Sequence, residues 1–255
     1  MCLLLLAFQV HPAYPVVLAA NRDEYYERPT APADWWADRP DVLGGRDLVS
    51  GGTWLAVTRS GRFAAVTNYR DPARPPGTES RGNLVPGALT GNVPDGDYSG
   101  YNLLSGDRDH LDYATNVNGR RCGLPPGVYG LSNGLLDSPW PKVRLGKQRL
   151  AGRLQLDPES LLDVLSDSAP APDSELPDTG VGLEAERALS PIFVRTPTYG
   201  TRCSSVLRID RKGWVDFLER TFPCQGGLGP PPSHPRPGGE LRRFRFRIGA
   251  YDPDQ

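Results

Sequence analysis

Residues 2–24 read CLLLLAFQVHPAYPVVLAANRDE, and this stretch decides how the fold is interpreted. An apolar run from Leu3 to Phe8 is followed by a second run from Val16 to Ala20, with two prolines between them. Short apolar runs that are bounded by turn residues are typical of buried strands. We therefore expect two paired strands, over residues 2–10 and 15–20, with the Asn-Arg-Asp-Glu sequence at the end of the second.

Cys2 directly follows the initiator methionine, which is commonly removed when the second residue is small. Removal would leave a thiol and an α-amine on one Cα. The thiolate is the nucleophilic form of cysteine, and an α-amine with a pKa of about 7.7–8.0 can act as a general base near neutral pH. Together they would form the reactive group of N-terminal-nucleophile catalysis. A cysteine at position 2 is also compatible with no catalytic role, so this hypothesis depends on the rest of the chain.

The composition indicates a globular protein. A chain of 255 residues can bury a full core, and its 38% hydrophobic and 23% charged content argue against disorder. The formal net charge of -1 provides no electrostatic attraction for nucleic acid or an anionic membrane surface. No apolar run approaches the length of a membrane span, and no Lys or Arg precedes the first run as in a signal peptide. We expect a cytoplasmic protein with one domain over residues 2–255, and the oligomeric state stays open.

Neither a metal site nor a cofactor-binding motif is predicted. The sequence has no CxxC pair, no HExxH, no GxGxxG and no P-loop lysine motif. Its cysteines and histidines are scattered, at Cys2, Cys122, Cys203 and Cys224 and at His11, His110 and His234. Four such cysteines in a chain of this length do not form a disulfide framework. We expect no bound metal or cofactor, and a small core residue at Cys203.

The remaining pattern places strands at both ends of the chain and helices between them. A second hairpin is expected over residues 54–59 and 62–67, and a third over 203–210 and 214–221. In the second hairpin, apolar and polar residues alternate imperfectly, so both faces of its sheet are expected to be covered. The other expected elements are short strands at 102–105 and 112–116, helices at 80–90, at 141–154 and from 157, Pro-rich loops at 27–43 and 167–186, a mobile segment at 225–240, and an edge strand at 241–248. This pattern predicts an α+β fold or a layered α/β/β/α fold.

Polar residues of a few types lie beside the expected strand ends. They are Arg22, Asp23, Asn68, Asn133 and Arg202. Asn side chains and backbone N–H groups can stabilise an oxyanion, an Arg near a thiol favours the thiolate, and an Asp can orient an α-amine. Each residue alone is also explained as a turn residue or a paired surface charge. As a set, their types suit acyl transfer.

Seven ordered motifs make the chain resemble the NRDE family, which is also called the transport and Golgi organisation 2 family. They cover nearly the whole chain. The motifs are MCL at 1–3, ANRDE at 20–24, GGTWL at 51–55, TNYR at 67–70, SRG at 80–82, LSNG at 131–134 with WPK at 140–142, and GTR at 200–202.

The family is in turn similar to N-terminal-nucleophile hydrolases of the penicillin V acylase and bile salt hydrolase type. This resemblance implies a four-layer αββα sandwich of two mainly antiparallel sheets. By motif order it also implies functional roles for Cys2 as nucleophile, Arg22 and Asp23 as an early pair, Asn68 and Asn133 as two asparagines, and Arg202 as a late arginine. In those acylases the early pair is spaced apart, whereas here it is adjacent. Adjacent strand residues point to opposite faces, which favours Arg22 over Asp23 as the neighbour of Cys2 unless a bulge intervenes.

The leading hypothesis is an N-terminal-nucleophile hydrolase that cleaves an amide or thioester bond of a small-molecule acyl substrate. The α-amine of Cys2 would accept the thiol proton, and Asn133, with Asn68 and a backbone N–H, would hold the oxyanion. Arg22 and Arg202 would favour the thiolate or bind a substrate carboxylate.

The same resemblance leaves a second hypothesis open, a non-catalytic binding or trafficking protein on this fold. Family members are linked to Golgi organisation and secretion in animals, and to haem mobilisation and lipid or acyl-CoA metabolism. Trp35, Trp36, Tyr25 and Tyr26 could then line an apolar pocket for haem, acyl-CoA or another lipid. A third hypothesis, a disulfide or redox role for Cys2, lacks a resolving cysteine nearby in sequence.

Overall fold

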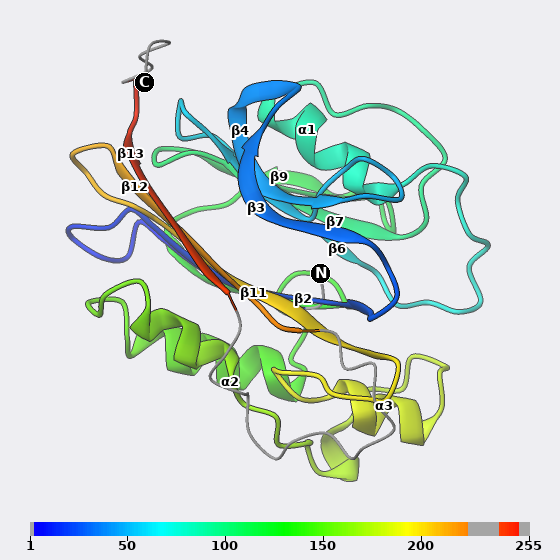
Figure 1. The fold of residues 1–255 in the computed structure, drawn as a ribbon. Coiled ribbons are helices and arrows are strands. Elements are labelled where there is room, and N and C mark those ends of the chain that lie inside the picture. The colour runs from blue at the N-terminus through cyan, green and yellow to red at the C-terminus, as the bar shows by residue number, and fades with distance from the viewer. Residues whose placement is uncertain (1–2, 224–239, 250–255) are drawn as a thin grey trace.

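Two antiparallel sheets lie face to face in the computed structural model, which describes residues 3–223 and 240–249 (Figure 1). The six-stranded sheet has the order β10 (Gly127–Leu131), β1 (Leu3–Phe8), β2 (Val16–Tyr25), β11 (Tyr199–Ile209), β12 (Trp214–Thr221) and β13 (Leu241–Arg247). The seven-stranded sheet has the order β3 (Thr30–Trp36), β4 (Arg39–Asp47), β5 (Leu55–Thr58), β6 (Phe63–Asn68), β7 (Tyr101–Gly106), β8 (Leu111–Thr115) and β9 (Arg121–Gly123).

Helices cover the outer face of each sheet (Figure 1). The seven-stranded sheet carries η1 (Arg81–Asn83) and α1 (Leu84–Leu89). The six-stranded sheet carries α2 (Pro141–Ala151) and η2 (Ser160–Leu165), with η3 (Asp173–Glu175) and α3 (Leu183–Leu189) on the same side. The predicted four-layer αββα sandwich of two antiparallel sheets is therefore confirmed.

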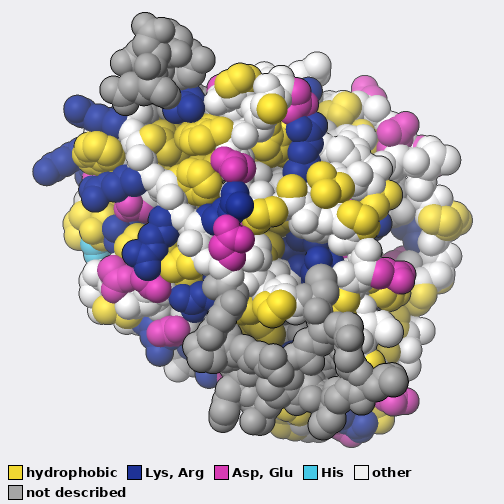
Figure 2. All heavy atoms as spheres, viewed as in Figure 1, with side chains coloured by type: hydrophobic (Ala, Val, Ile, Leu, Met, Phe, Trp, Pro, Cys, Tyr) yellow, Lys and Arg dark blue, Asp and Glu magenta, His cyan; other side chains and the backbone are white. Residues whose placement is uncertain are grey.

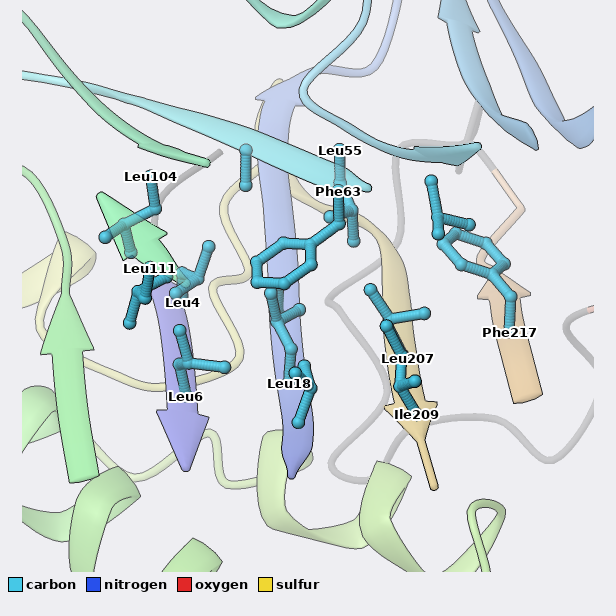
Figure 3. Close-up of a cluster of buried hydrophobic side chains, with 14 of the residues drawn as sticks. Leu4, Leu6, Leu18, Leu55, Phe63, Leu104, Leu111, Leu207, Ile209 and Phe217 are labelled. Atoms are coloured by element: carbon cyan, nitrogen blue, oxygen red, sulfur yellow. The ribbon is translucent and has the colours of Figure 1, made fainter. Parts of the chain in front are cut away.

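Three buried apolar layers hold these four layers together. The layer between the sheets, called here the interlayer core, is drawn in Figure 3 and includes Leu4, Leu6, Leu18, Leu55, Phe63, Leu104, Leu207 and Phe217. In β1 the alternate residues Leu3 and Leu5 face the helices instead. Because both faces of β1 are buried, its sequence is a continuous apolar run rather than an alternating one.

The three predicted hairpins are present. In the first, Leu3 pairs with Asn21 and Phe8 with Val16. The turn of the second hairpin contains Gly61 at φ 83°, a conformation that glycine adopts without strain. The predicted edge strand over 241–248 is confirmed as β13, the outermost strand of its sheet among the described residues. The predicted mobile segment, 225–240, lies almost entirely outside the described residues.

The prediction of a loop over residues 27–43 is wrong, because β3 and most of β4 lie there. Pro32 argued against a strand, since proline lacks the N–H that a central strand needs. However, β3 is an edge strand, and the pairing register shifts between Ala31 and Asp34. An edge bulge tolerates the missing donor.

The predicted short strands and helices are confirmed with small changes. The helix expected from residue 157 is the 3-10 helix η2 (Ser160–Leu165), and at its start Asp157 Oδ1 accepts hydrogen bonds from the N–H groups of Glu159 and Ser160. The predicted loop over 167–186 also contains η3 and the first residues of α3. Among the described residues, no helix combines the length and apolar character that a membrane crossing requires.

β9 and β10 were not predicted. Glycines at both ends of residues 127–130 concealed β10, yet one of them has a packing role. A Cβ at Gly130 would approach the Val143 side chain of α2 to 2.6 Å, so the strand needs glycine where the helix crosses it.

Candidate active site

A cavity of about 220 Å³ lies where several chain segments end next to one another. Asp23 comes from β2, Asn68 from the last position of β6, and Asn133 from the loop after β10. The remaining lining residues are Tyr69, Arg70, Arg81, Lys142, Leu189 and Tyr199. The cavity is therefore polar and is built from both sheets and both helical layers.

Three of the residues predicted from motif order line this cavity, namely Asp23, Asn68 and Asn133. They are far apart in sequence, so only the packing of the two sheets brings them together. Cys2 lies outside the described residues, which begin at Leu3. Arg22 and Arg202 make their contacts at a different place, described below.

The amide of Asn133 is held in one orientation. Its Oδ1 accepts a hydrogen bond from Arg70 Nη2 at 3.3 Å, and its Nδ2 donates to the Asn68 carbonyl at 2.9 Å. A guanidinium can only donate, so the amide oxygen must face Arg70 and the amide nitrogen must face the other way. A primary amide has two N–H groups, of which the Asn68 carbonyl takes one. The side chain is 5% exposed, so this arrangement is buried at the cavity wall.

Arg70 is in turn fixed by a buried carboxylate. Glu186 of α3 is 3% exposed, and its Oε2 lies 2.5 Å from Arg70 Nη1. Its other oxygen accepts hydrogen bonds from the backbone N–H and the hydroxyl of Thr179. Charge-assisted bonds of this kind are about twice as strong as neutral ones, so the guanidinium beside Asn133 is well anchored.

A second buried network fixes the loop that carries Asn133. Asn102 of β7 donates from Nδ2 to the Gly134 carbonyl at 2.9 Å, and Tyr113 donates to Asn102 Oδ1 at 2.7 Å. Both side chains are essentially unexposed. Sequence reasoning missed Asn102 and Tyr113, because nothing in their local pattern distinguishes them from other strand residues.

Asp23 is a buried carboxylate next to an irregular part of the sheet. Its Oδ1 accepts a hydrogen bond from the Thr201 hydroxyl at 2.6 Å, and that hydroxyl accepts one from Val194 N–H at 2.9 Å. The pairing of β2 with β11 shifts register between Thr201 and Cys203, so a bulge falls at Arg202. Such bulges are common beside active sites because they redirect side chains.

Arg22 and Arg202 share a hydrogen-bond network around the turn that follows β2. Arg22 Nη1 donates to the Thr30 hydroxyl at 3.2 Å, and its guanidinium lies over the Trp54 ring at 4.4 Å. The Thr30 hydroxyl donates to the Arg28 carbonyl, which also accepts from Arg202 Nη1 at 3.1 Å. Arg22 thus faces the interlayer side of β2, opposite Asp23, as the alternation rule requires.

The aromatic residues considered for an apolar ligand pocket do not gather around one space. Trp36 is buried against α1, whereas Trp35 packs beside Phe246 at the interlayer core. Tyr25 is 55% exposed. In the described part of the chain, no group of three His, Cys, Asp or Glu side chains is arranged to hold a metal ion.

Glu219 is a buried carboxylate that joins the two sheets. It lies on β12 and is 1% exposed, and its Oε1 accepts the Ala33 N–H of β3 at 2.7 Å. Burial raises the pKa of this carboxyl above its ordinary value of 4.5. Burial also raises the pKa of the neighbouring Cys203 thiol. Cys203 is thus a core residue, as predicted.

Glu219 is expected to make stability depend on pH. The folded state binds its proton more tightly than the unfolded state, so the free energy of unfolding falls as pH rises from 4.5 through the raised pKa. Glutamine at position 219 does not titrate. The free energy of unfolding of Glu219→Gln minus that of the wild type should therefore increase as pH rises through this range. Urea unfolding at several values between about pH 4 and pH 8 measures it. The exposed Glu184→Gln is the control, and a pH-independent difference for Glu219→Gln would contradict the prediction.

Comparison with known sequences places the chain in a family. The model of the family described as "Transport and Golgi organisation 2" matches residues 1–224. The chain belongs to the transport and Golgi organisation 2 family. The resemblance inferred from the motifs is therefore confirmed.

Two mammalian members of the transport and Golgi organisation 2 family are similar over most of their length. The human "Transport and Golgi organization protein 2 homolog" is 36% identical over 258 residues, which cover 87% of this chain and 93% of that protein. The bovine homolog is 35% identical over 261 residues, with the same coverage. Among solved structures, a Caenorhabditis elegans "N-acylethanolamine-hydrolyzing acid amidase (NAAA) ortholog" matches with a TM-score of 0.49 and 10% identity, over 81% of this chain and 92% of that chain.

The motifs of the transport and Golgi organisation 2 family also contain cavity residues that sequence reasoning did not select. Arg70 belongs to the TNYR motif, Arg81 to SRG and Lys142 to WPK, and all three line the cavity. Their membership of these motifs was the signal that could have identified them.

Proposed function

We propose that this protein is a cysteine N-terminal-nucleophile hydrolase that cleaves an amide or thioester bond of a small acyl substrate through Cys2. The observation that carries the proposal is the meeting of Asp23, Asn68 and Asn133 at one polar cavity. Cys2 is one peptide bond from Leu3, and Leu3 pairs with Asn21, two residues before Asp23. Cys2, the proposed nucleophile, therefore directly precedes β1 in the sequence, and β1 pairs with β2, the strand that carries Asp23.

In the proposed reaction the α-amine of Cys2 accepts the thiol proton, and the thiolate attacks the substrate carbonyl carbon. The carbonyl oxygen becomes an oxyanion, to which the Asn133 amide donates. The tetrahedral intermediate collapses to a thioester on Cys2, and the departing amine or thiolate takes the proton from the α-ammonium. Water then attacks the thioester and gives a proton to the α-amine. The carboxylic acid leaves, and the returned proton restores the thiol.

The other residues have supporting roles in this proposal. Asp23 orients the α-ammonium of Cys2 through its carboxylate. The Asn68 carbonyl holds the Asn133 amide, as its 2.9 Å hydrogen bond shows. Arg22 and Arg202 stabilise the turn after β2 through Thr30 and the Arg28 carbonyl, and in this proposal their positive charges favour the thiolate form of Cys2.

Intact mass spectrometry of the purified protein, before and after a thiol-selective acylating probe, tests this proposal. The expected result is loss of the Met1 mass and one adduct that maps to Cys2. A panel of amide and thioester substrates then follows. Retained Met1, or an unreactive Cys2, would overturn the hydrolase proposal and favour the non-catalytic binding protein.

A further inference from the structure

Arg70 and Glu186 form an ion pair that is shielded from solvent. Acidic and basic side chains are intermixed on the face of the molecule shown in Figure 2, and ion pairs between exposed side chains contribute little because water screens them. The Arg70 side chain is instead 12% exposed and that of Glu186 is 3% exposed. Taking two charges out of water costs free energy that their attraction can fail to offset, so net stability does not by itself explain this pair.

The helix α3 is attached to the rest of the domain through the carboxylate of this pair. Glu186 is the buried residue of α3, whereas Leu183, at the start of the helix, is 54% exposed. Helices of globular proteins usually pack through an apolar face, but the buried group of α3 is a carboxylate. Glu186 Oε1 accepts two hydrogen bonds from Thr179, and Oε2 lies against Arg70, so both oxygens are engaged. The contact that holds α3 is therefore directed at Arg70.

Arg70 connects this carboxylate to the cavity. Its Nη1 faces Glu186 and its Nη2 donates to Asn133 Oδ1, so one planar guanidinium joins the two side chains. The Arg70 backbone N–H also donates to the Asn133 carbonyl at 2.8 Å. A cation at the amide oxygen polarises the amide, which makes its N–H groups stronger donors. Glu186 is not among the described residues that line the cavity, so any effect it has on the reaction passes through Arg70.

We infer that Glu186 is a positioning residue of the proposed active site, which acts through Arg70 to hold the Asn133 amide with an N–H group toward the oxyanion. This inference rests on the proposed hydrolase function. It gives α3 a role in the chemical step as well as in the fold. A change at Glu186 should then act on kcat, because the bond from Asn133 strengthens as charge develops on the substrate oxygen.

Glu186→Gln tests the inference and preserves the shape of the side chain. Glutamine keeps one oxygen acceptor but has no charge, so Arg70 exchanges a charge-assisted bond for a neutral one. We expect kcat to fall about tenfold, in line with the difference between these two kinds of bond, and KM to stay within about threefold. Glu186→Asp restores the carboxylate with a shorter reach and should recover part of kcat. A wild-type kcat in Glu186→Gln would overturn the inference.

Asp173→Asn is the matched control for the attachment of α3. Asp173 also pairs with an arginine, Arg187 of the same helix, through two hydrogen bonds, but both side chains are exposed and neither contacts Arg70. This variant should leave kcat unchanged. If Glu186→Gln does not fold, Arg70→Lys performs the same test, because an ammonium keeps the charge but lacks the planar fork that reaches Glu186 and Asn133 together.

A double-mutant cycle distinguishes positioning from support of the fold. In the Asn133→Ala background the group through which Glu186 acts is absent, so Glu186→Gln should cause little further loss of kcat. If Glu186 only supports the fold, the two losses should multiply, and that result would overturn the inference. Thermal unfolding of the four proteins accompanies the kinetics.

The side-chain amide of Asn133 provides a readout that does not require activity. Its two Nδ2 protons give NMR signals, which are assigned by their loss in Asn133→Ala. Glu186→Gln should shift both signals, whereas Asp173→Asn should leave them in place. If no substrate is hydrolysed, the hydrolase proposal fails, and shifted signals would still support the link from Glu186 to Asn133. Unchanged signals in Glu186→Gln would overturn that link, whether or not a substrate is hydrolysed.

Discussion

Replacing Cys2 with alanine is expected to abolish turnover, with a loss of kcat of at least about a thousandfold on any substrate that the wild type hydrolyses. The variant keeps the α-amine, since alanine at position 2 also allows removal of Met1, but it lacks the sulfur that attacks the carbonyl carbon. The change therefore removes the covalent route and leaves substrate binding in place. Initial rates and intact masses of both proteins measure this effect.

Cys122→Ala is the matched control for the nucleophile. Cys122 is a free, partly buried cysteine on β9, on the far edge of the seven-stranded sheet. Its replacement should leave kcat close to that of the wild type. Full activity in Cys2→Ala, with Met1 shown by mass to be removed, would mean that another group performs the chemistry.

Replacing Asn133 with alanine is expected to lower kcat by about a hundredfold to a thousandfold, the usual effect of losing one oxyanion donor. The residue is suited to this role because Arg70 holds its amide oxygen and leaves its amide nitrogen to donate. The effect should appear mainly in kcat rather than KM, since the bond strengthens as charge develops on the oxygen.

Asn133→Asp separates the chemical role from a structural one. Aspartate keeps an oxygen for Arg70 but has no N–H group, so it should lose kcat like the alanine variant; its second oxygen also faces the Asn68 carbonyl, so its fold must be measured as well. Thermal unfolding of each variant checks the fold, and the exposed Asn118→Ala is the control. A kcat within about threefold of the wild type in Asn133→Asp would exclude this amide as an oxyanion donor.

The strands of the fold were predictable where buried apolar runs are bounded by turns. β1, β2, β5, β6, β11 and β12 have this pattern, and the three hairpins that they form were predicted. β3 and β10 were missed because proline and glycine disfavour strands, and only the tertiary structure explains why they are tolerated there. An edge bulge accommodates Pro32, and the crossing of α2 requires Gly130. Neither contact is visible from the local sequence.

Part of the candidate cavity was predictable from motif order, whereas its geometry was not. Motif order selected Asp23, Asn68 and Asn133, which line one cavity. Strand alternation favoured Arg22 over Asp23 as the neighbour of Cys2, whereas Asp23 is the one that joins the two asparagines. The cavity forms where β2, the end of β6 and the loop after β10 meet. This arrangement depends on the packing of the two sheets and on long-range contacts such as the ion pair between Arg70 and Glu186, which lie 116 positions apart in the sequence.

The opposite orientation of Arg22 and Asp23 limits how β2 can change in length during evolution. One inserted or deleted residue just before Asn21 would turn the rest of the strand over, because side chains alternate with a period of two. The guanidinium of Arg22 would then face the cavity, and the carboxylate of Asp23 would be buried beside Trp54. Since β1 and β11 pair with β2 on both sides, no free edge can absorb the slip. This strand can accept substitutions, whereas changes of length are confined to loops such as residues 9–15.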